Sequence, residues 1–186
     1  QTAARNYKYG FQEQVLIHAQ RPDATACAEI GVWNRLGRWV NRGATGIALL
    51  RHPNLPYRIR YVFDVSDTNS RENREIPLWQ MKPEYENEVM DTLQTRFQYD
   101  FDGAFGDDIE TLSQQLAEEA AGDYLPDLLN NKQDSFLEEL DDDSIARWFK
   151  EAVSESVRYM VLHRCGYAPE LDNDVFGRIQ DFNTEI

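Results

Sequence analysis

The chain has 186 residues, with 33 Asp and Glu against 19 Lys and Arg and a formal net charge of −14 at pH 7. Its 41% hydrophobic and 12% aromatic content is typical of a folded domain and excludes a disordered tail. No apolar run approaches the roughly 18 residues that a membrane span needs, and no apolar stretch at the start predicts a secretory signal.

The location expected from the sequence is the cytoplasm. The two cysteines, Cys27 and Cys165, lie far apart in the chain, which fits a reducing compartment better than a disulfide scaffold. Because the first residue is Gln rather than Met, we expect the chain to be a piece of a longer protein.

Charge is distributed unevenly along the chain. Residues 1–62 carry nine Lys/Arg and three acids, a local balance of +6, whereas residues 63–186 carry 10 basic and 30 acidic groups, a balance of −20. Salt confines surface fields to about 8 Å, so a ligand meets the local balance and not the total. The basic part is therefore a candidate surface for a polyanion, and the alternative is that both parts are solvated faces.

Two helices are predicted at the start. Apolar residues at helical spacing predict a helix over residues 10–20, which ends before Pro22. Asp23 is placed to cap a second helix that runs to Leu36 and is closed by Gly37.

A small antiparallel sheet should follow these helices. Residues 38–40 and 47–50 have the composition of two strands, and the Asn- and Gly-rich turn between them predicts a hairpin. A third strand is expected over residues 57–65. Because Arg58 and Arg60 are two residues apart in it, their side chains should share one face.

The remaining chain reads as acidic helices. Residues 66–76 are polar and turn-prone and predict a loop. Three helices should follow: one with Pro83 at its first position, one marked by the apolar residues of 109–124, and one that begins after the acidic residues 141–143 and stops at Gly166.

These elements predict an α+β fold in which helices pack on a small antiparallel sheet and a mostly α-helical C-terminal lobe follows. We expect a nucleic-acid-binding lobe over residues 1–82 and an acidic helical lobe over residues 83–186, packed on the first.

The run from Trp33 to Gly46 is the most informative stretch, because it combines three arginines, two tryptophans and three glycines. Arginine matches phosphate, tryptophan offers a stacking face and glycine permits close backbone approach, which together predict a surface for single-stranded nucleic acid.

Trp33 is expected in the core. Arg38 and Trp39 should point to opposite faces; burial of Trp39 is the expected arrangement, and base stacking is the alternative. The candidate DNA contacts are Lys8, Tyr9, Arg21, Arg35, Arg38, Trp39, Arg42, Thr45, Arg58 and Arg60.

Signatures of catalysis are missing from the sequence. It has no His-Glu-x-x-His, no Gly-x-Ser-x-Gly and no phosphate-binding loop. His163 and Cys165 form an isolated His-x-Cys without a second pair, and Asp64 and Asp67 are interpreted as turn-forming residues and not as metal ligands. We therefore expect no enzyme activity, no cofactor and no metal.

Three blocks resemble the N-terminal domain of ArdC-type antirestriction proteins in order and spacing. They are YGFQEQVLIHAQRPDAT at residues 9–25, the pattern W-x4-R-x3-RG-x2-GI at residues 33–47, and VFDVSDT at residues 62–68. The resemblance covers residues 7–68. It implies a cytoplasmic domain that binds single-stranded DNA without strong sequence preference, as an accessory to conjugative transfer, replication or protection from restriction.

The later part of the chain is also similar to a known type of protein. The motifs PLWQMKPEY at residues 77–85, DSFLEEL at residues 134–140 and RCGY at residues 164–167 resemble the N-terminal region of very large proteins of conjugative plasmids and transposons. The resemblance implies helicase-like and methylase-like domains downstream in the same polypeptide as further partners. The family's metalloprotease motif does not occur here, so no peptidase activity transfers, and Gln12 and Glu13 stand where the family usually shows Asn.

The function predicted from the sequence is thus non-catalytic binding of single-stranded DNA in a mobile-element protein, away from any membrane. One alternative is an acidic protein-interaction module, including one that imitates DNA to deceive a restriction enzyme. Another is a structural spacer between catalytic modules.

Overall fold

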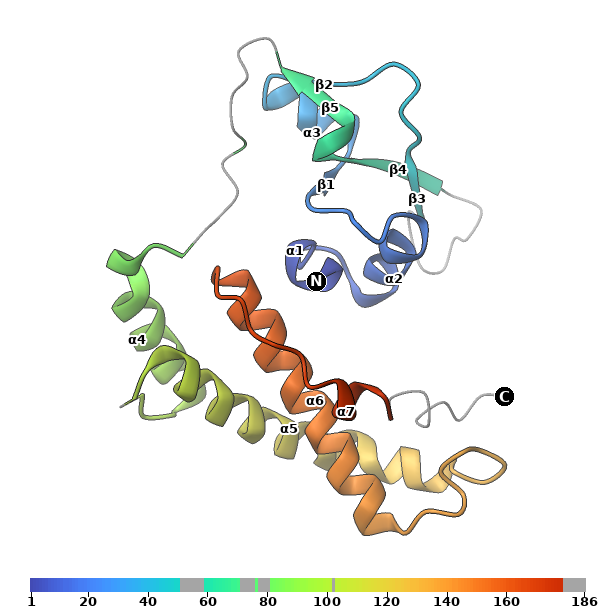
Figure 1. Cartoon of the computed structure of the whole chain (residues 1–186), viewed down its shortest axis with the longest axis vertical. Helices are drawn as coiled ribbons and strands as arrows, with labels where there is room; N and C mark the ends of the chain where they lie inside the picture. The colour runs from blue at the N-terminus through green and yellow to red at the C-terminus, as the bar shows by residue number, and fades with distance from the viewer. Residues whose placement is uncertain (51–58, 71–75, 77–80, 102, 179–186) are drawn as a thin grey trace. The chain divides into compact units, whose positions relative to one another are not determined.

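The computed structural model spans the chain and describes residues 1–50, 59–70, 76, 81–101 and 103–178 (Figure 1). The fold is α+β, as predicted, with small antiparallel sheets in the N-terminal part and helices in the C-terminal part. The chain divides into two compact units, Gln1–Trp79 and Gln80–Ile186, three residues before the boundary predicted from the sequence.

Short helices and strands alternate in the N-terminal unit. In chain order they are α1 (Thr2–Arg5), α2 (Phe11–Gln20), β1 (Cys27–Ala28), α3 (Ile30–Arg35), β2 (Arg38–Val40), β3 (Ile47–Leu50), β4 (Ile59–Asp64), the 3-10 turn η1 (Val65–Asp67) and β5 (Thr68–Ser70). Strands β1, β4 and β3 form an antiparallel sheet in that order, and β2 pairs with β5 in a separate two-stranded sheet.

The predicted hairpin of residues 38–40 and 47–50 is wrong, because these strands belong to different sheets. Trp39 lies opposite Asn69 of β5, and Ala48 of β3 lies opposite Tyr61 of β4. The N–H of Asn41 donates to the carbonyl of Asp67 at 2.8 Å, which carries the β2–β5 pairing one residue further and turns the chain away from β3. Strand β5 lies within the segment predicted as a loop, and it was not predicted because Thr-Asn-Ser has no alternation of apolar and polar residues.

The predicted second helix also begins later than expected. Asp23 caps nothing; its side chain is 81% exposed and pairs with Arg21. The N–H groups of Thr25 and Ala26 donate instead to the buried Asp64 carboxylate, at 2.7 and 2.9 Å. These bonds hold the segment extended into β1, so α3 starts only at Ile30.

One face of the β3–β4 pair closes the core of the N-terminal unit. Its buried residues are Tyr9, Ile17, Ala24, Cys27, Ile47, Leu49 and Val62. Helix α2 packs on β3, and the Gln20 side chain bonds both the N–H and the carbonyl of Ala48 at 2.9 Å. Along β4, Val62 and Asp64 face inward, whereas Ile59 and Tyr61 are exposed.

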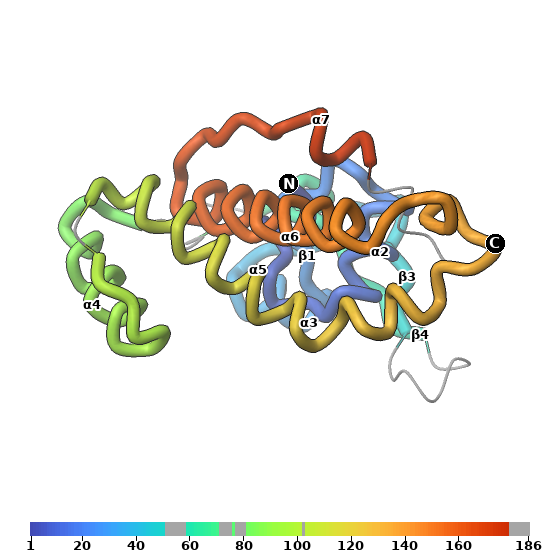
Figure 2. Tube along the Cα trace, turned by 90° about the horizontal axis from the view of Figure 1, so that it is seen from below, coloured from blue at the N-terminus to red at the C-terminus, as the bar shows by residue number. Residues whose placement is uncertain are grey.

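The C-terminal unit is helical. It contains the 3-10 turn η2 (Pro83–Tyr85), α4 (Glu86–Phe97), α5 (Phe105–Asn130), α6 (Asp142–Arg164) and α7 (Asn173–Phe176). Helices α5 and α6 lie against each other (Figures 1 and 2). The predicted ends of α6 are confirmed: the Asp141 carboxylate accepts from the N–H of Ser144 at 2.8 Å, and Gly166 follows the helix with φ 92°.

In the described part of the chain, no helix combines the length and the apolarity that a membrane crossing requires.

Candidate nucleic-acid interface

Tyr9 is a core residue, which corrects its assignment as a DNA contact. Its side chain is 8% exposed, and its hydroxyl donates to the carbonyl of Cys27 at 2.8 Å. Burial raises the pKa of the Tyr9 phenol above its ordinary value. A ring enclosed in this way has no face left for a base.

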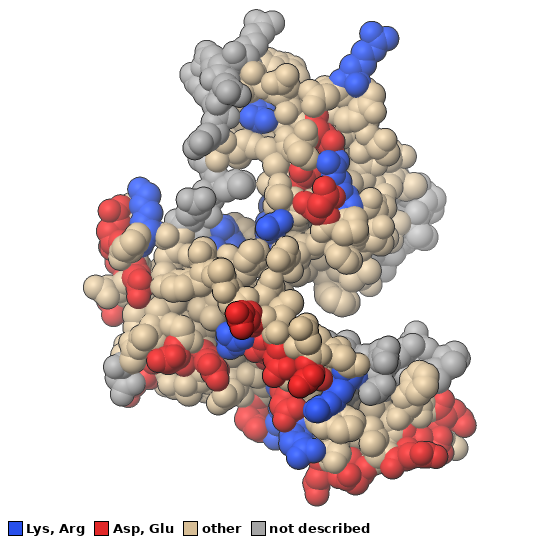
Figure 3. Space-filling model, in the orientation of Figure 1, with Lys and Arg blue, Asp and Glu red and all other residues tan. Residues whose placement is uncertain are grey.

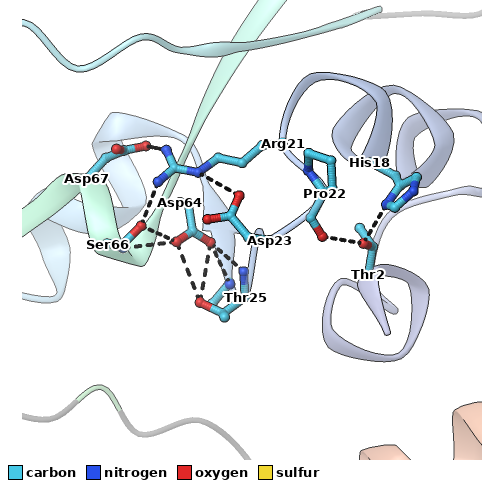
Figure 4. A network of polar contacts seen from close by, with 10 residues as sticks. Thr2, His18, Arg21, Pro22, Asp23, Thr25, Asp64, Ser66 and Asp67 are labelled. Atoms are coloured by element: carbon cyan, nitrogen blue, oxygen red, sulfur yellow. Dashed lines mark hydrogen bonds and ion pairs between the residues drawn. The ribbon is translucent and has the colours of Figure 1, made fainter.

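Arg21 holds the exit of β4 and does not project as a phosphate contact. Its guanidinium donates to the Asp67 carboxylate at 2.5 Å and to the Ser66 hydroxyl at 2.9 Å (Figure 4). The hydrogen bond to Asp67 raises the pKa of Arg21. With its charge neutralised by Asp67, and by Asp23 at 3.6 Å, Arg21 stabilises the turn after β4.

Arg38 and Trp39 take the opposite arrangement to the expected one. Arg38 is half-buried and donates to the hydroxyl and the carbonyl of Thr68, at 2.7 and 3.1 Å, so it ties β2 to β5. Trp39 is 48% exposed. The buried tryptophan is Trp33, as predicted, and its indole N–H donates to the Phe63 carbonyl at 3.0 Å.

Arg60 faces the core side of β4, where it forms ion pairs with two glutamates. Its guanidinium lies 2.5 Å from the Glu13 carboxylate and 3.0 Å from that of Glu29, and it stands over the Tyr9 ring at 5.7 Å. The hydrogen bond to Glu13 raises the pKa of Arg60. This side of the strand is therefore not an open basic groove. Arg58, predicted to share it, lies outside the described residues.

The other predicted contacts are exposed. They are Lys8, which lies over the Tyr9 ring at 5.5 Å, Arg35 at the end of α3, and Arg42 and Thr45 in the connection from β2 to β3. Among the described residues, neither Arg35 nor Arg42 has an ion-pair or hydrogen-bond partner for its side chain. Arg42 occupies the tip of a turn in which Ala44 N–H bonds the Asn41 carbonyl at 3.1 Å, with Gly43 at φ 87°.

The outer side of β4 was not predicted as part of the site. Ile59 and Tyr61 are 53% and 56% exposed, and Phe63 continues the same side with its ring half-buried. We call this side of β4, formed by Ile59 and the two aromatic residues Tyr61 and Phe63, the aromatic face. Opposite them on β3 lie Leu50 and Ala48, so the face continues across both strands. The alternation of Arg60 with Tyr61 is visible in the sequence, but it does not say which side is open.

Gly46 joins the exposed loop to the aromatic face. A Cβ at this position would lie 3.1 Å from side-chain atoms of both Tyr61 and Phe63, so with glycine the backbone lies directly against the two rings, and a larger residue would require them to shift. Arg42 is four residues earlier, which places its Cα within about 14 Å of Gly46 along the chain. Arg42, for which the described residues offer no ion-pair or hydrogen-bond partner, is thus separated by only four residues from the glycine that contacts the two rings.

Asp64 is a buried carboxylate that joins the segment before β1 to the turn after β4. It is 1% exposed and accepts from the N–H groups of Thr25, Ala26 and Ser66 and from the Ser66 hydroxyl, at 2.7 to 3.0 Å (Figure 4). Burial alone would raise its pKa, but the hydrogen bonds from Ser66, Ala26 and Thr25 bring the pKa below its ordinary value. No group of three or more His, Cys, Asp or Glu side chains among the residues described here could hold a metal ion.

Comparison of the chain with protein-family models, with curated proteins and with solved structures gave no match.

Proposed function

We propose that the N-terminal unit binds single-stranded DNA without catalysing a reaction, on the outer side of the β3–β4 pair. The observation that supports this most is the aromatic face with Gly46 against it. Every base has a π-face, and stacking on an aromatic side chain contributes about 1–3 kcal/mol per base. Bases in a duplex are already stacked on one another, so an aromatic face of this kind favours an unpaired strand.

The exposed cations supply the second half of the proposal. Arg42 is exposed and has no side-chain partner among the described residues, and its guanidinium offers the donor pairs that match phosphate oxygens. Thr45, between Arg42 and Gly46 in the sequence, adds an exposed hydroxyl, and Trp39 is 48% exposed. None of these contacts reads a base edge, which fits binding with little sequence preference.

The resemblance of residues 7–68 to ArdC-type domains supports the same proposal, because it covers the unit that carries the aromatic face. On this proposal the protein acts in the cytoplasm, as an accessory of a conjugative element, next to helicase-like and methylase-like domains of the same polypeptide.

The test is a fluorescence-anisotropy titration of the whole chain with a labelled 12-nucleotide thymidine strand and with a duplex of equal length. We expect preference for the single strand and an affinity that falls with salt. Tyr61→Ala should weaken binding about 5- to 150-fold, from the loss of one stacked base. Arg42→Ala should lower the slope of log K against log salt by about 0.7, which corresponds to one phosphate of a single strand.

Tyr85→Ala is the matched control, since this tyrosine is 44% exposed but belongs to the C-terminal unit. It should bind like the unmodified chain. Absence of binding at low salt, or equal affinity of the Tyr61 and Tyr85 variants, would refute the proposed site.

A further inference from the structure

An apolar groove runs between α5 and α6 in the C-terminal unit. Its cavity volume is about 610 Å³. Helix α6 contributes Phe149, Val153, Val157 and Met160, and α5 contributes Tyr124 and Leu128. Tyr124 is 64% exposed and Met160 37% exposed, so apolar surface of both helices is left open to solvent.

The spacing of the groove residues fits a helix as the occupant. Phe149, Val153, Val157 and Met160 follow one another at intervals of four, four and three residues, which is one stripe of α6. With a rise of about 1.5 Å per residue, the stripe is roughly 16 Å long, or three turns. A groove between two helices accepts the ridge of a third, with anchors at i, i+3 or i+4, and i+7.

The charge around the groove selects a basic occupant. Helix α5 contains seven Asp and Glu and no Lys or Arg, and its last turn, which forms one end of the groove, also carries the negative end of the helix dipole. Asp123 and Asp127 are exposed beside Tyr124. Acidic side chains also gather where the chain turns from α5 into α6 (lower right of Figure 3).

Two cations of α6 that neighbour groove residues in the sequence are neutralised within the unit. Lys150 lies 2.6 Å from the Glu118 carboxylate, and Arg158 lies 2.6 Å from that of Glu155. Residues 80–186 together carry eight Lys/Arg against 26 Asp/Glu. A second copy of this unit, or an anionic membrane surface, would bring like charges together at the groove and is disfavoured.

We propose that the α5–α6 groove binds an amphipathic helix of a partner protein, about three turns long, whose apolar stripe is flanked by Lys and Arg. This interaction goes beyond DNA binding, involves the other unit of the chain and does not depend on the proposed function.

The experiment uses the whole chain and two labelled 18-residue peptides with the same leucine stripe at helical spacing. One peptide carries Lys at the flanking positions and the other Glu. We expect the Lys peptide to bind at least tenfold more tightly at low salt, with the difference shrinking as salt is raised. Equal affinity of the two peptides, or no measurable binding of the Lys peptide, would overturn the proposal.

Variants connect the binding to the groove. Tyr124→Ser and Met160→Ser change exposed side chains. Each should lower the affinity for the Lys peptide at least fivefold and leave the helical circular dichroism unchanged. Phe136→Ser is the matched control, because Phe136 is 66% exposed and does not line the groove. The double change Asp123→Lys with Asp127→Lys should shift the preference toward the Glu peptide. The proposal is refuted if the groove variants bind like the control, or if sedimentation shows a dimer of the chain that Met160→Ser dissociates.

Discussion

Replacing Asp64 by Asn should destabilise the N-terminal unit strongly, although the side chain keeps its size and shape. Each oxygen of the carboxylate receives two hydrogen bonds of 3.0 Å or less, one from the N–H groups of Thr25 and Ala26 and the other from the N–H and hydroxyl of Ser66, and the Thr25 hydroxyl adds longer contacts to both oxygens at 3.4 and 3.5 Å. An amide has one oxygen, so its NH₂ must face one of these pairs. If the NH₂ group faces Ser66, the Ser66 hydroxyl can rotate and accept a hydrogen bond from it. The Ser66 N–H, however, loses its acceptor and faces a second donor.

The size of the effect follows from these bonds. A buried donor left without a partner costs about 1–3 kcal/mol, and the remaining bonds lose the strength that an ionised acceptor gives them. We expect the free energy of unfolding to fall by about 2–4 kcal/mol in total, which lowers the melting temperature by roughly 5–15 °C for a chain of this size.

The assay is urea and thermal unfolding at pH 7, with Asp23→Asn as the control. Asp23 is 81% exposed, and its pair with Arg21 is a surface contact at 3.6 Å, so its loss should change the free energy of unfolding by less than about 0.5 kcal/mol. If the Asp64 variant unfolds within that same margin, the carboxylate does not hold the segment before β1 and the reasoning is refuted.

The advantage of Asp64 over Asn should also depend on pH. The folded-state pKa lies below the ordinary value of 3.8. A carboxylate of this kind contributes its full stabilisation above the unfolded-state pKa and loses it as the pH falls through the folded-state pKa. The difference between the two proteins should therefore be constant near neutral pH and shrink under acid conditions. A difference that grew on acidification would contradict the direction of the shift.

Three further substitutions test other parts of the structure. Gly46→Ala should lower the free energy of unfolding by about 1–2 kcal/mol and weaken oligonucleotide binding, because the new Cβ lies 3.1 Å from Tyr61 and Phe63; unchanged melting and affinity would contradict this contact. Arg60→Ala should lower stability by about 1 kcal/mol, since its two glutamate partners lose a half-exposed ion pair, and any change in the salt slope of DNA binding would place Arg60 in the site. Gly122→Ala should raise stability by about 0.5–1 kcal/mol, as the added methyl meets open space in the middle of α5; a lower melting temperature would refute it.

Helices α2 and α6 were predictable because their signals are local. Apolar spacing and the Pro after it define α2, and the acidic cap and Gly166 define both ends of α6. The start of α3 was not predictable, because it depends on Asp64, which lies 39 residues beyond Thr25 in the sequence. The pairing of the strands was not predictable for the same reason. Composition indicates where the strands are, but which strands pair depends on contacts between residues far apart in the sequence.

The sides of β4 show a similar limit for the candidate site. Period-two alternation separates Arg60 from Tyr61 correctly, and the usual expectation exposes the arginine and buries the ring. Here Glu13 and Glu29, brought in by other elements, neutralise the arginine on the core side. Tyr61 therefore faces solvent. Which side of β4 is exposed depends on Glu13 and Glu29, and the alternation of residues within the strand carries no information about them.

The side chain of Gln20 has a consequence for how the protein behaves at high concentration. In the described part of the unit, β3 is the outer strand of its sheet, and an outer strand with free N–H and C=O groups is a template for pairing with another molecule. The Gln20 amide occupies both groups of Ala48 and imitates a neighbouring strand for one residue. It thereby blocks the pairing of another strand at Ala48, so concentrated protein has one place fewer at which molecules can join edge to edge.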